Sequence, residues 1–219
     1  MNDANQKQRI PQAVRSAKMQ QRLSEAAYNI IRDGGYANFR TSAVAKAAGV
    51  SQGAQLHHYP TKNSLAVAAL DYAYRQYHQQ FEANYAMIDE CDDLLDLIFK
   101  DFKDFYLSGY FSTALDILIS GGKNEDLKEQ LVAITLDNRT AIERVWLEEL
   151  INDGWPLALA EEILALSHSI VRGFAARALV INDQAQFDRL LFRWRAMVKS
   201  LEGEKNNVVQ RFELKKSSN

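Results

Sequence analysis

The sequence predicts an all-α protein of about nine helices, with an N-terminal three-helix domain followed by a C-terminal helical bundle. Prolines and glycines, which interrupt helices, number only three and ten in 219 residues. Strong helix formers such as Ala, Leu, Glu, Gln and Lys are abundant, and no alternation of Val, Ile and Thr predicts a strand. Because 47% of the residues are hydrophobic, the chain can bury a substantial core.

The chain opens with a polar arm, which is followed by the first helix. Residues 1–15 show no apolar periodicity, so we expect a flexible arm that either orders on a partner or stays a disordered tail. The first helix is expected from Ser16 to Asp33, because its apolar residues recur at helical spacing and two glycines follow it. Tyr36 and Phe39 should then plug the core beneath the next segment.

The stretch 41–62 predicts two short helices joined by a tight turn. Thr41 or Ser42 can cap the first helix with a side-chain oxygen, and Gly49 should end it, since a left-handed residue costs little without a Cβ. Ser51 caps the second helix, which a proline ends. Two helices joined in this way form a helix-turn-helix, whose second helix enters the DNA major groove.

The second of these helices is rich in hydrogen-bonding side chains, which a helix that only filled a core would not need. Its two glutamines can read adenine edges, whereas Ser51, Tyr59 and Lys62 suit phosphate oxygens. Gly53 leaves room for the backbone to approach the groove. The residues expected to contact DNA are Thr41, Ser42, Ser51, Gln52, Gly53, Gln55, Leu56, His57, Tyr59 and Lys62.

This segment resembles the helix-turn-helix of the TetR family of bacterial transcriptional regulators over residues 1 to about 65. The matching positions are Thr41, Val44, Ala45, Ala48, Gly49, Val50, Ser51, Gly53, His58, Tyr59, Lys62 and Leu65. The chain departs from the family pattern at Gln55, where Leu is usual, and at Leu56, where Tyr is usual. A shift of one residue, in which Leu56 packs and Gln55 reads DNA, would accommodate both departures.

The charge distribution is asymmetric along the chain. Residues 1–65 contain nine Lys and Arg against three Asp and Glu, a formal +6, although the whole chain carries −2. The remaining residues therefore carry −8. A basic head on an acidic body is typical of a DNA-binding module attached to a domain that does not touch DNA.

Beyond the motif, the apolar periodicity predicts six further helices, at 63–85, 93–107, 111–120, 124–152, 156–181 and 186–201. We therefore expect four parts: a flexible arm at 1–15, a DNA-binding domain at 16–65, a helical domain at 66–202, and a charged, frayed tail at 203–219. The resemblance implies that the helical domain at 66–202 binds a ligand and forms the dimer.

The last two predicted helices are apolar on more than one side, so both sides need to be buried. The resemblance implies that these two helices form a four-helix dimer interface. A homodimer also suits DNA reading, because two half-sites lie about one helical turn, roughly 34 Å, apart or a multiple of it. The alternative is a monomeric bundle core. The expected interface residues are Leu166, Ile170, Phe174, Leu190, Trp194 and Met197.

Aromatic side chains concentrate in the middle helices, where they either line an apolar cavity or form the core. The resemblance implies a pocket for a small-molecule inducer in this region. The expected ligand-binding residues are Phe102, Phe105, Tyr106, Tyr110 and Trp146. His168, Arg172 and Arg177 lie on a largely apolar helix, where they either contact an acidic ligand or complete an interface salt bridge. The interface is the favoured interpretation.

Other classes of function find little support in the sequence. No phosphate-binding glycine loop or hydrolase motif occurs, so we expect no enzyme, no cofactor and no metal site. His57 and His58 are adjacent and so make a poor metal pair on a helix. Cys91 is the only cysteine, and no apolar run reaches the roughly 20 residues that cross a bilayer. We therefore expect a cytoplasmic protein that does not enter membranes.

Together these observations predict a TetR-like, ligand-responsive repressor that binds a palindromic operator in double-stranded DNA as a homodimer. The alternative is a helical module that binds a small molecule or a partner protein and contacts DNA only weakly and without specificity. The ratio of specific to non-specific affinity separates the two hypotheses.

Overall fold

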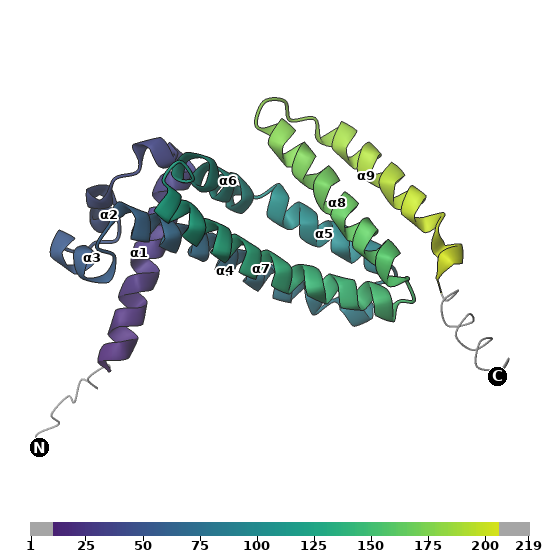
Figure 1. Ribbon diagram of the computed structural model, residues 1–219, viewed down its shortest axis with the longest axis horizontal. Coiled ribbons are helices and arrows are strands. Elements are labelled where there is room, and N and C mark those ends of the chain that lie inside the picture. Colours follow the sequence, from purple (N-terminus) through teal and green to yellow (C-terminus); the bar gives the residue numbers. More distant parts are fainter. Residues whose placement is uncertain (1–10, 206–219) are drawn as a thin grey trace, which may run out of the picture. The chain divides into compact units, whose positions relative to one another are not determined.

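The computed structural model describes residues 11–205, and within that range it contains nine α-helices and no strand (Figure 1). The predicted all-α class is therefore confirmed. The helices are α1 (Gln12–Gly34), α2 (Thr41–Ala47), α3 (Gln52–His58), α4 (Lys62–Tyr85), α5 (Leu94–Tyr106), α6 (Gly109–Gly121), α7 (Glu125–Asn152), α8 (Leu157–Ala178) and α9 (Gln184–Lys199). Short 3-10 turns lie at Tyr36–Asn38, Ile88–Glu90 and Glu202–Glu204.

The described residues fall into two compact units. The first combines residues 11–73 with the segment Leu115–Leu131, and the second combines Tyr74–Ala114 with residues 132–205. The division therefore falls within α4, α6 and α7, each of which contributes residues to both units. The division at residue 65 that the sequence predicts does not include Leu115–Leu131 in the first unit. That division remains a prediction.

Helix α1 organises the first unit. Leu23, Ala27 and Ile31 lie on its buried side, each with at most 2% of its surface exposed. The helix begins at Gln12 rather than at Ser16, so part of the expected arm is helical. Pro11 occupies the N-cap position, where its fixed φ suits a helix start and its missing N–H costs nothing. The rest of the arm, 1–10, and the tail from 206 lie outside the described residues.

The segment Leu115–Leu131 contacts the turn that follows α1. Gly35 ends α1 with a positive φ of 76°, and the next backbone N–H, that of Tyr36, donates a hydrogen bond of 2.6 Å to the carboxylate of Asp116. Ser120 donates to the other carboxylate oxygen of Asp116 at 2.9 Å. Tyr36 and Phe39 are buried, as predicted. A side chain of α6 thus satisfies a backbone donor beside the helix-turn-helix.

The second unit is centred on a buried carboxylate, that of Asp101. Tyr77 Oη and Trp146 Nε1 each donate to Asp101 Oδ2 at 2.9 Å, and Asn84 lies 3.4 Å from the other oxygen. Burial raises the pKa of Asp101, and the hydrogen bonds from these three side chains offset part of that rise. The donors come from α4 and α7, so the carboxylate ties both helices to α5.

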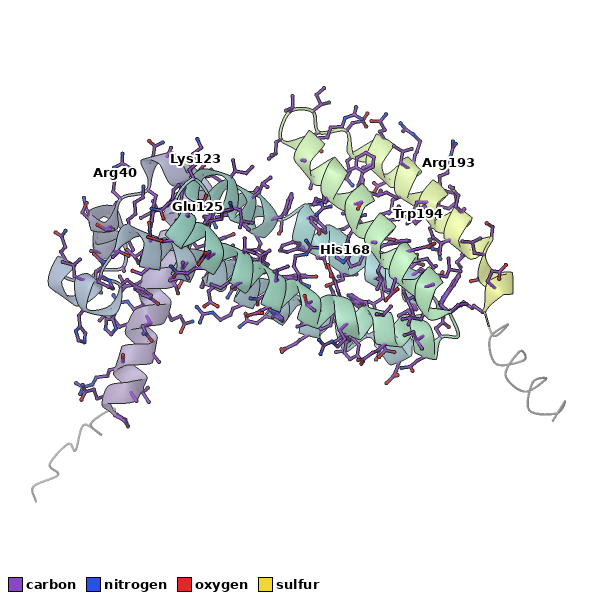
Figure 2. The ribbon with its side chains drawn as sticks, viewed as in Figure 1. Arg40, Lys123, Glu125, His168, Arg193 and Trp194 are labelled. Carbon is purple, nitrogen blue, oxygen red and sulfur yellow. The ribbon has the colours of Figure 1, made fainter. Side chains whose placement is uncertain are left out.

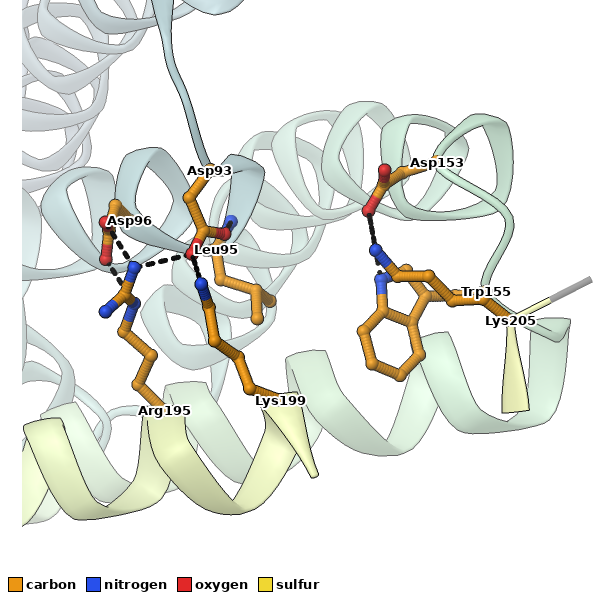
Figure 3. A network of polar contacts seen from close by, with 8 residues as sticks. All are labelled: Asp93, Leu95, Asp96, Asp153, Trp155, Arg195, Lys199 and Lys205. Carbon is orange, nitrogen blue, oxygen red and sulfur yellow. Dashed lines mark hydrogen bonds and ion pairs between the residues drawn. The ribbon is translucent and has the colours of Figure 1, made fainter. Parts of the chain in front are cut away.

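Ion pairs fasten the C-terminal end of α9 to the rest of the second unit (Figure 3). Asp93 caps α5 through the Leu95 N–H, and its carboxylate also accepts from Arg195 at 2.5 Å and Lys199 at 2.6 Å. Farther along the chain, Lys205 pairs with Asp153 at 2.7 Å. The basic residues of α9 therefore join this helix to the start of α5, and Lys205, beyond α9, contacts the residue that follows α7.

Candidate functional site

The helix-turn-helix is built by α2, α3 and the turn between them. Val44, Ala45 and Ala48 are buried, which allows α2 to pack closely. Gly49 ends α2 with a φ of 62°, as predicted. The predicted cap of α2 is wrong, because Arg40 occupies the N-cap position and no side-chain oxygen caps this helix. The first hydrogen bonds of α2 are instead made by the Arg40 carbonyl, which accepts the N–H groups of Ala43 and Val44.

An arginine from α1 fixes the turn of the motif. Arg22 Nη2 donates to the carbonyl oxygens of Ala48 and Gly49, the second at 3.5 Å. These carbonyls end α2 and have no helical partner of their own. In the sequence, Arg22 is recognisable only as one of the basic residues, because a contact to backbone oxygens 26 residues away leaves no local signal.

Helix α3 presents a solvent-exposed face that can approach a DNA groove. Ser51 caps the helix as predicted, since its Oγ accepts the Ala54 N–H at 3.1 Å. Leu56 is 47% exposed. The exposed residues among those predicted to contact DNA are Ser42, Ser51, Gln52, Gly53, Leu56 and His57. Their place in the motif makes this face the candidate base-reading surface.

The predicted shift of α3 by one residue is wrong. Gln55 is fully buried, whereas Leu56 is exposed, which is the reverse of the expected arrangement. Gln55 Nε2 donates to the Tyr59 carbonyl at 2.5 Å, and Gln55 Oε1 has no hydrogen-bond partner among residues 11–205. Gln55 therefore takes the core position that Leu usually fills, and its side chain does not reach the exposed face.

Replacing Gln55 by Leu is expected to stabilise the first unit by about 1 kcal/mol. The substitution removes a buried oxygen without a partner, whose desolvation costs about 1–3 kcal/mol, while the Tyr59 carbonyl it leaves can turn to water. Chemical denaturation of the full chain measures the change. Gln52→Leu, on the exposed face of α3, is the matched control and should change stability by less than about 0.5 kcal/mol. A destabilised Q55L variant would contradict the assignment of Gln55 to the core.

The residues expected to anchor phosphates are less exposed than those of the candidate base-reading surface. Thr41, Tyr59 and Lys62 are all half-buried. The Lys62 ammonium lies 4.7 Å from the centre of the Tyr36 ring, and burial together with the charge of Arg40 lowers the pKa of Lys62. The ring thus orients a cation next to the start of α4.

Arg40 is a further basic side chain at this surface. Its guanidinium is exposed and donates to the carbonyl oxygens of Ala37 and Phe39, both at 2.9 Å. In the sequence, Arg40 is one of nine basic residues in 1–65 and has no predicted role. Its position directly before α2 is the sequence feature that could have identified it as a DNA-contacting candidate.

The five aromatic residues predicted to bind a ligand mainly form the core of the second unit. Phe102 stacks on His168 at 3.8 Å, and Trp146 is buried against Phe81 at 5.5 Å. Phe105 and Tyr106 reach a cavity of only about 10 Å³, the size of one water molecule. Tyr110 is half-buried. A larger cavity, of about 470 Å³, lies between α7 and α8, and none of the five lines it.

The residues predicted to form a dimer interface differ in their surroundings. Leu166, Leu190 and Met197 are 49%, 41% and 56% exposed, which leaves an apolar face on α8 and α9. Ile170 is half-buried. Phe174 and Trp194 instead contact their own unit. The ring of Phe174 lies 4.7 Å from that of Phe187. Trp194, on α9 (Figure 2), donates from Nε1 to Ser167 at 2.9 Å.

Two further features of the described residues bear on the class of function. No group of His, Cys, Asp and Glu within residues 11–205 is arranged to hold a metal ion. In the same range, no helix combines the length and the apolar character that a membrane span requires.

Comparison with known proteins connects the helix-turn-helix to a family. Residues 23–69 match the model of the bacterial regulatory proteins of the tetR family. The chain is also 36% identical, over 182 residues, to the HTH-type transcriptional regulator CymR of Pseudomonas putida, and this match covers 83% of the chain and 90% of CymR.

Solved structures share the fold at lower sequence identity. A TetR transcription regulator from Haloarcula marismortui is 17% identical, with a TM-score of 0.61, and the match covers 84% of this chain and 98% of that one. The multidrug-binding protein EbrR, in complex with imidazole, is 18% identical, with a TM-score of 0.55, and the match covers 80% and 93% of the two chains. Both have the architecture described above.

Proposed function

This chain belongs to the TetR family of bacterial regulatory proteins, and from that premise we propose that it is a repressor that binds a palindromic operator as a homodimer. The observation that carries the proposal is the exposed face of α3, where Gln52, Gly53, Leu56 and His57 lie together on a helix-turn-helix. The capped start of α3 and the arginine-held turn support it, because a reading helix needs a fixed orientation.

The proposed division of labour on DNA follows the chemistry of the side chains. Gln52 can form two hydrogen bonds with an adenine edge, and Leu56 can contact a thymine methyl group. Thr41, Tyr59 and Lys62, together with the exposed Arg40, would bind phosphates, and the position of the Lys62 ammonium beside the Tyr36 ring supports this role for the lysine. Base contacts would then set the sequence preference, while phosphate contacts would set the register and the dependence on salt.

A homodimer would present two copies of α3 to two half-sites. The exposed apolar face of α8 and α9 supports this part of the proposal, because a patch of large apolar side chains is typical of an interaction surface. Half-sites about 34 Å apart, or a multiple of that distance, would match the two-fold symmetry of the dimer.

A small molecule bound in the second unit would release the DNA. It can do so only by binding more tightly to a dimer whose two reading helices are wrongly spaced for the operator. In that case the ligand and the operator would each lower the affinity of the protein for the other.

The proposal is tested by selecting bound sequences from a random duplex pool at physiological salt and titrating the winner against scrambled DNA. A palindromic winner that binds about 10³-fold more tightly than scrambled DNA is the expected result. No enrichment would overturn the proposal and would favour the alternative, a helical binding module that contacts DNA through its basic charge alone.

Gln52→Ala and Lys62→Ala are expected to affect DNA binding in different ways. The first removes a base contact, worth about 1–3 kcal/mol of discrimination, and so should lower the ratio of specific to non-specific affinity. The second removes a phosphate contact and should weaken all DNA alike while reducing the slope of log K against log salt by about one. Titrations of operator and scrambled DNA at several salt concentrations measure both effects. Equal changes in specificity would contradict the assigned roles.

A further inference from the structure

The cavity between α7 and α8 has the size of a ligand site. Its volume is about 470 Å³, within the range of about 300–1,000 Å³ that small-molecule sites occupy. Leu147, Leu164 and Ala165 supply an apolar part of its wall. Every lining residue belongs to the second unit.

Positive charge dominates the polar part of this wall. Three arginines line the cavity, against two glutamates, Glu143 and Glu161. Arg139 pairs with Glu143 at 2.6 Å, whereas Arg144 and Arg172 form no ion pair with any residue between 11 and 205. The cavity thus offers the exposed guanidinium groups of Arg144 and Arg172, which no carboxylate among the described residues neutralises.

His168 adds a buried polar atom without a partner. The residue lies on α8 (Figure 2). It is only 8% exposed, and its ring stacks on the Phe102 ring at 3.8 Å. Its Nδ1 lies 3.2 Å from Tyr106 Oη. Within the described part of the chain, Nε2 makes no hydrogen bond, and a carboxylate oxygen of Glu143 lies 3.5 Å away. Burial, and then the charges of Arg139 and Arg172, lower the pKa of His168 to about 3. The imidazole therefore stays neutral and adds no charge to the cavity.

We propose that this cavity binds an organic carboxylate with an apolar body, which is the small-molecule effector of the regulator. The carboxylate would pair with Arg172 and Arg139, and the apolar body would pack on Leu147 and Leu164. Guanidinium groups bind carboxylates through paired, charge-assisted hydrogen bonds, which suits arginine at such a site. This inference rests on the proposed function, because it names the ligand class of the same regulator.

A single negative charge fits this cavity better than a double one. Because the three arginines face two glutamates and a neutral imidazole, the wall carries one uncompensated positive charge. A monocarboxylate would neutralise it, whereas a phosphate monoester carries close to two charges at pH 7. The leucines of the wall favour an apolar body over a sugar or another polar one.

The cavity and the apolar dimer face occupy different sides of α8. The cavity residues Leu164, His168 and Arg172 recur at four-residue spacing, which places them on one side of the helix. Leu166 and Ile170 lie on another side. A substitution in the cavity therefore leaves the proposed dimer face intact, so its effect on ligand binding can be measured on the assembled protein.

The test compares acids with their uncharged amides on the full-length protein. Hexanoate and benzoate at millimolar concentration should raise the melting temperature, whereas hexanamide and benzamide should not, because the amide lacks the charge that the arginines recognise. Sodium chloride at matching ionic strength controls for screening. Equal shifts from an acid and its amide, or no shift from either acid, would overturn the proposal.

Two variants with opposite expected effects sharpen the test. Arg172→Gln should weaken acid binding at least about tenfold by calorimetry, because it removes a charge-assisted pair. Glu143→Gln should tighten it, because it frees Arg139 from its present partner. Arg189→Gln, an exposed arginine of α9 outside the cavity, is the matched control and should leave acid binding unchanged. Undiminished binding by R172Q, or weaker binding by E143Q, would overturn the proposal.

The outcome is separable from that of the proposed function. If the chain selects a palindromic operator but binds neither acid, the carboxylate inference fails and the repressor proposal stands. If it binds the acids but selects no DNA sequence, the repressor proposal fails, and the cavity remains a carboxylate site in a binding module.

Discussion

In the proposed homodimer, replacing Leu166 and Met197 together by aspartate is expected to separate the two subunits and to weaken binding to the proposed operator at least about a hundredfold. Both side chains lie on the apolar face of α8 and α9, with about half of their surface exposed. Burying four carboxylates in a symmetric interface costs more than such a contact gains. A monomer holds only one half-site, and specific binding usually exceeds non-specific binding by about 10³-fold or more.

Sedimentation velocity measures the assembly, and titration of the selected operator measures the affinity. Phe192→Asp is the matched control, because Phe192 is 70% exposed on α9 but lies on the side that faces α5. This variant should remain dimeric. Leu166 and Met197 also test the face better than Phe174 and Trp194, whose contacts within their own unit would be lost at the same time. A dimer that survives the double substitution would place the interface elsewhere.

Lowering the pH from about 7.5 to about 5 is expected to destabilise the protein by about 2 kcal/mol through His168 alone. The pKa of His168 in the folded chain is about 3, against an ordinary value of 6.5. Between these values the unfolded chain binds a proton that the folded chain does not. Stability therefore falls as the pH falls below 6.5, and the loss grows until the pH approaches 3.

Denaturant titrations across this pH range, on the wild type and on His168→Gln, isolate the contribution. Glutamine can still accept a hydrogen bond from Tyr106 but does not titrate. The variant also loses the stack on the Phe102 ring, which shifts its stability by the same amount at every pH, so the slope of stability against pH is the decisive readout. An equally steep slope in H168Q would contradict the assignment.

Asp93 and Asp101 also have shifted pKa values, and they too make the stability depend on pH. Burial raises the pKa of Asp93, but hydrogen bonds from Lys199, Leu95 and Arg195 outweigh it and lower the pKa overall, so its contribution is lost only at more acid pH. The raised pKa of Asp101 acts in the opposite direction, because a buried carboxyl that takes up a proton becomes easier to keep buried. Both contributions are common to the wild type and H168Q, and they cancel in the difference.

The sequence predicted the helices and the helix-turn-helix well because their signals are local. The glycines at 35 and 49, the serine at 51 and the asparagine at 124 act within one turn of their own position. The orientation of α3 about its own axis was not predictable in the same way. A helix of seven residues is too short to show a repeating stripe, so packing decided that Gln55 is buried and Leu56 exposed.

The cavity between α7 and α8 could not be predicted from the sequence for a different reason. Arg139 lies on α7 and Arg172 on α8. Both side chains line the same cavity only because of the way in which these two helices pack together, and the sequence does not show that packing. Aromatic content pointed instead to Phe102 and Trp146, which the structure uses as core around His168 and Asp101. From the sequence, contact with an acidic ligand was one of two possible roles for His168 and Arg172, and a salt bridge in the dimer interface was the favoured one.

The contact between Asp116 and Tyr36 limits how this protein can be recombined with its relatives. A fragment that stops at residue 73 would carry all of α1, α2 and α3 but would lack the carboxylate that accepts the Tyr36 N–H. It would also lack Leu127 and Leu131, which are fully buried. A chimera that exchanges DNA specificity therefore has to transplant two stretches of chain, the N-terminal one and residues 115–131, because a single crossover would separate parts that fold together.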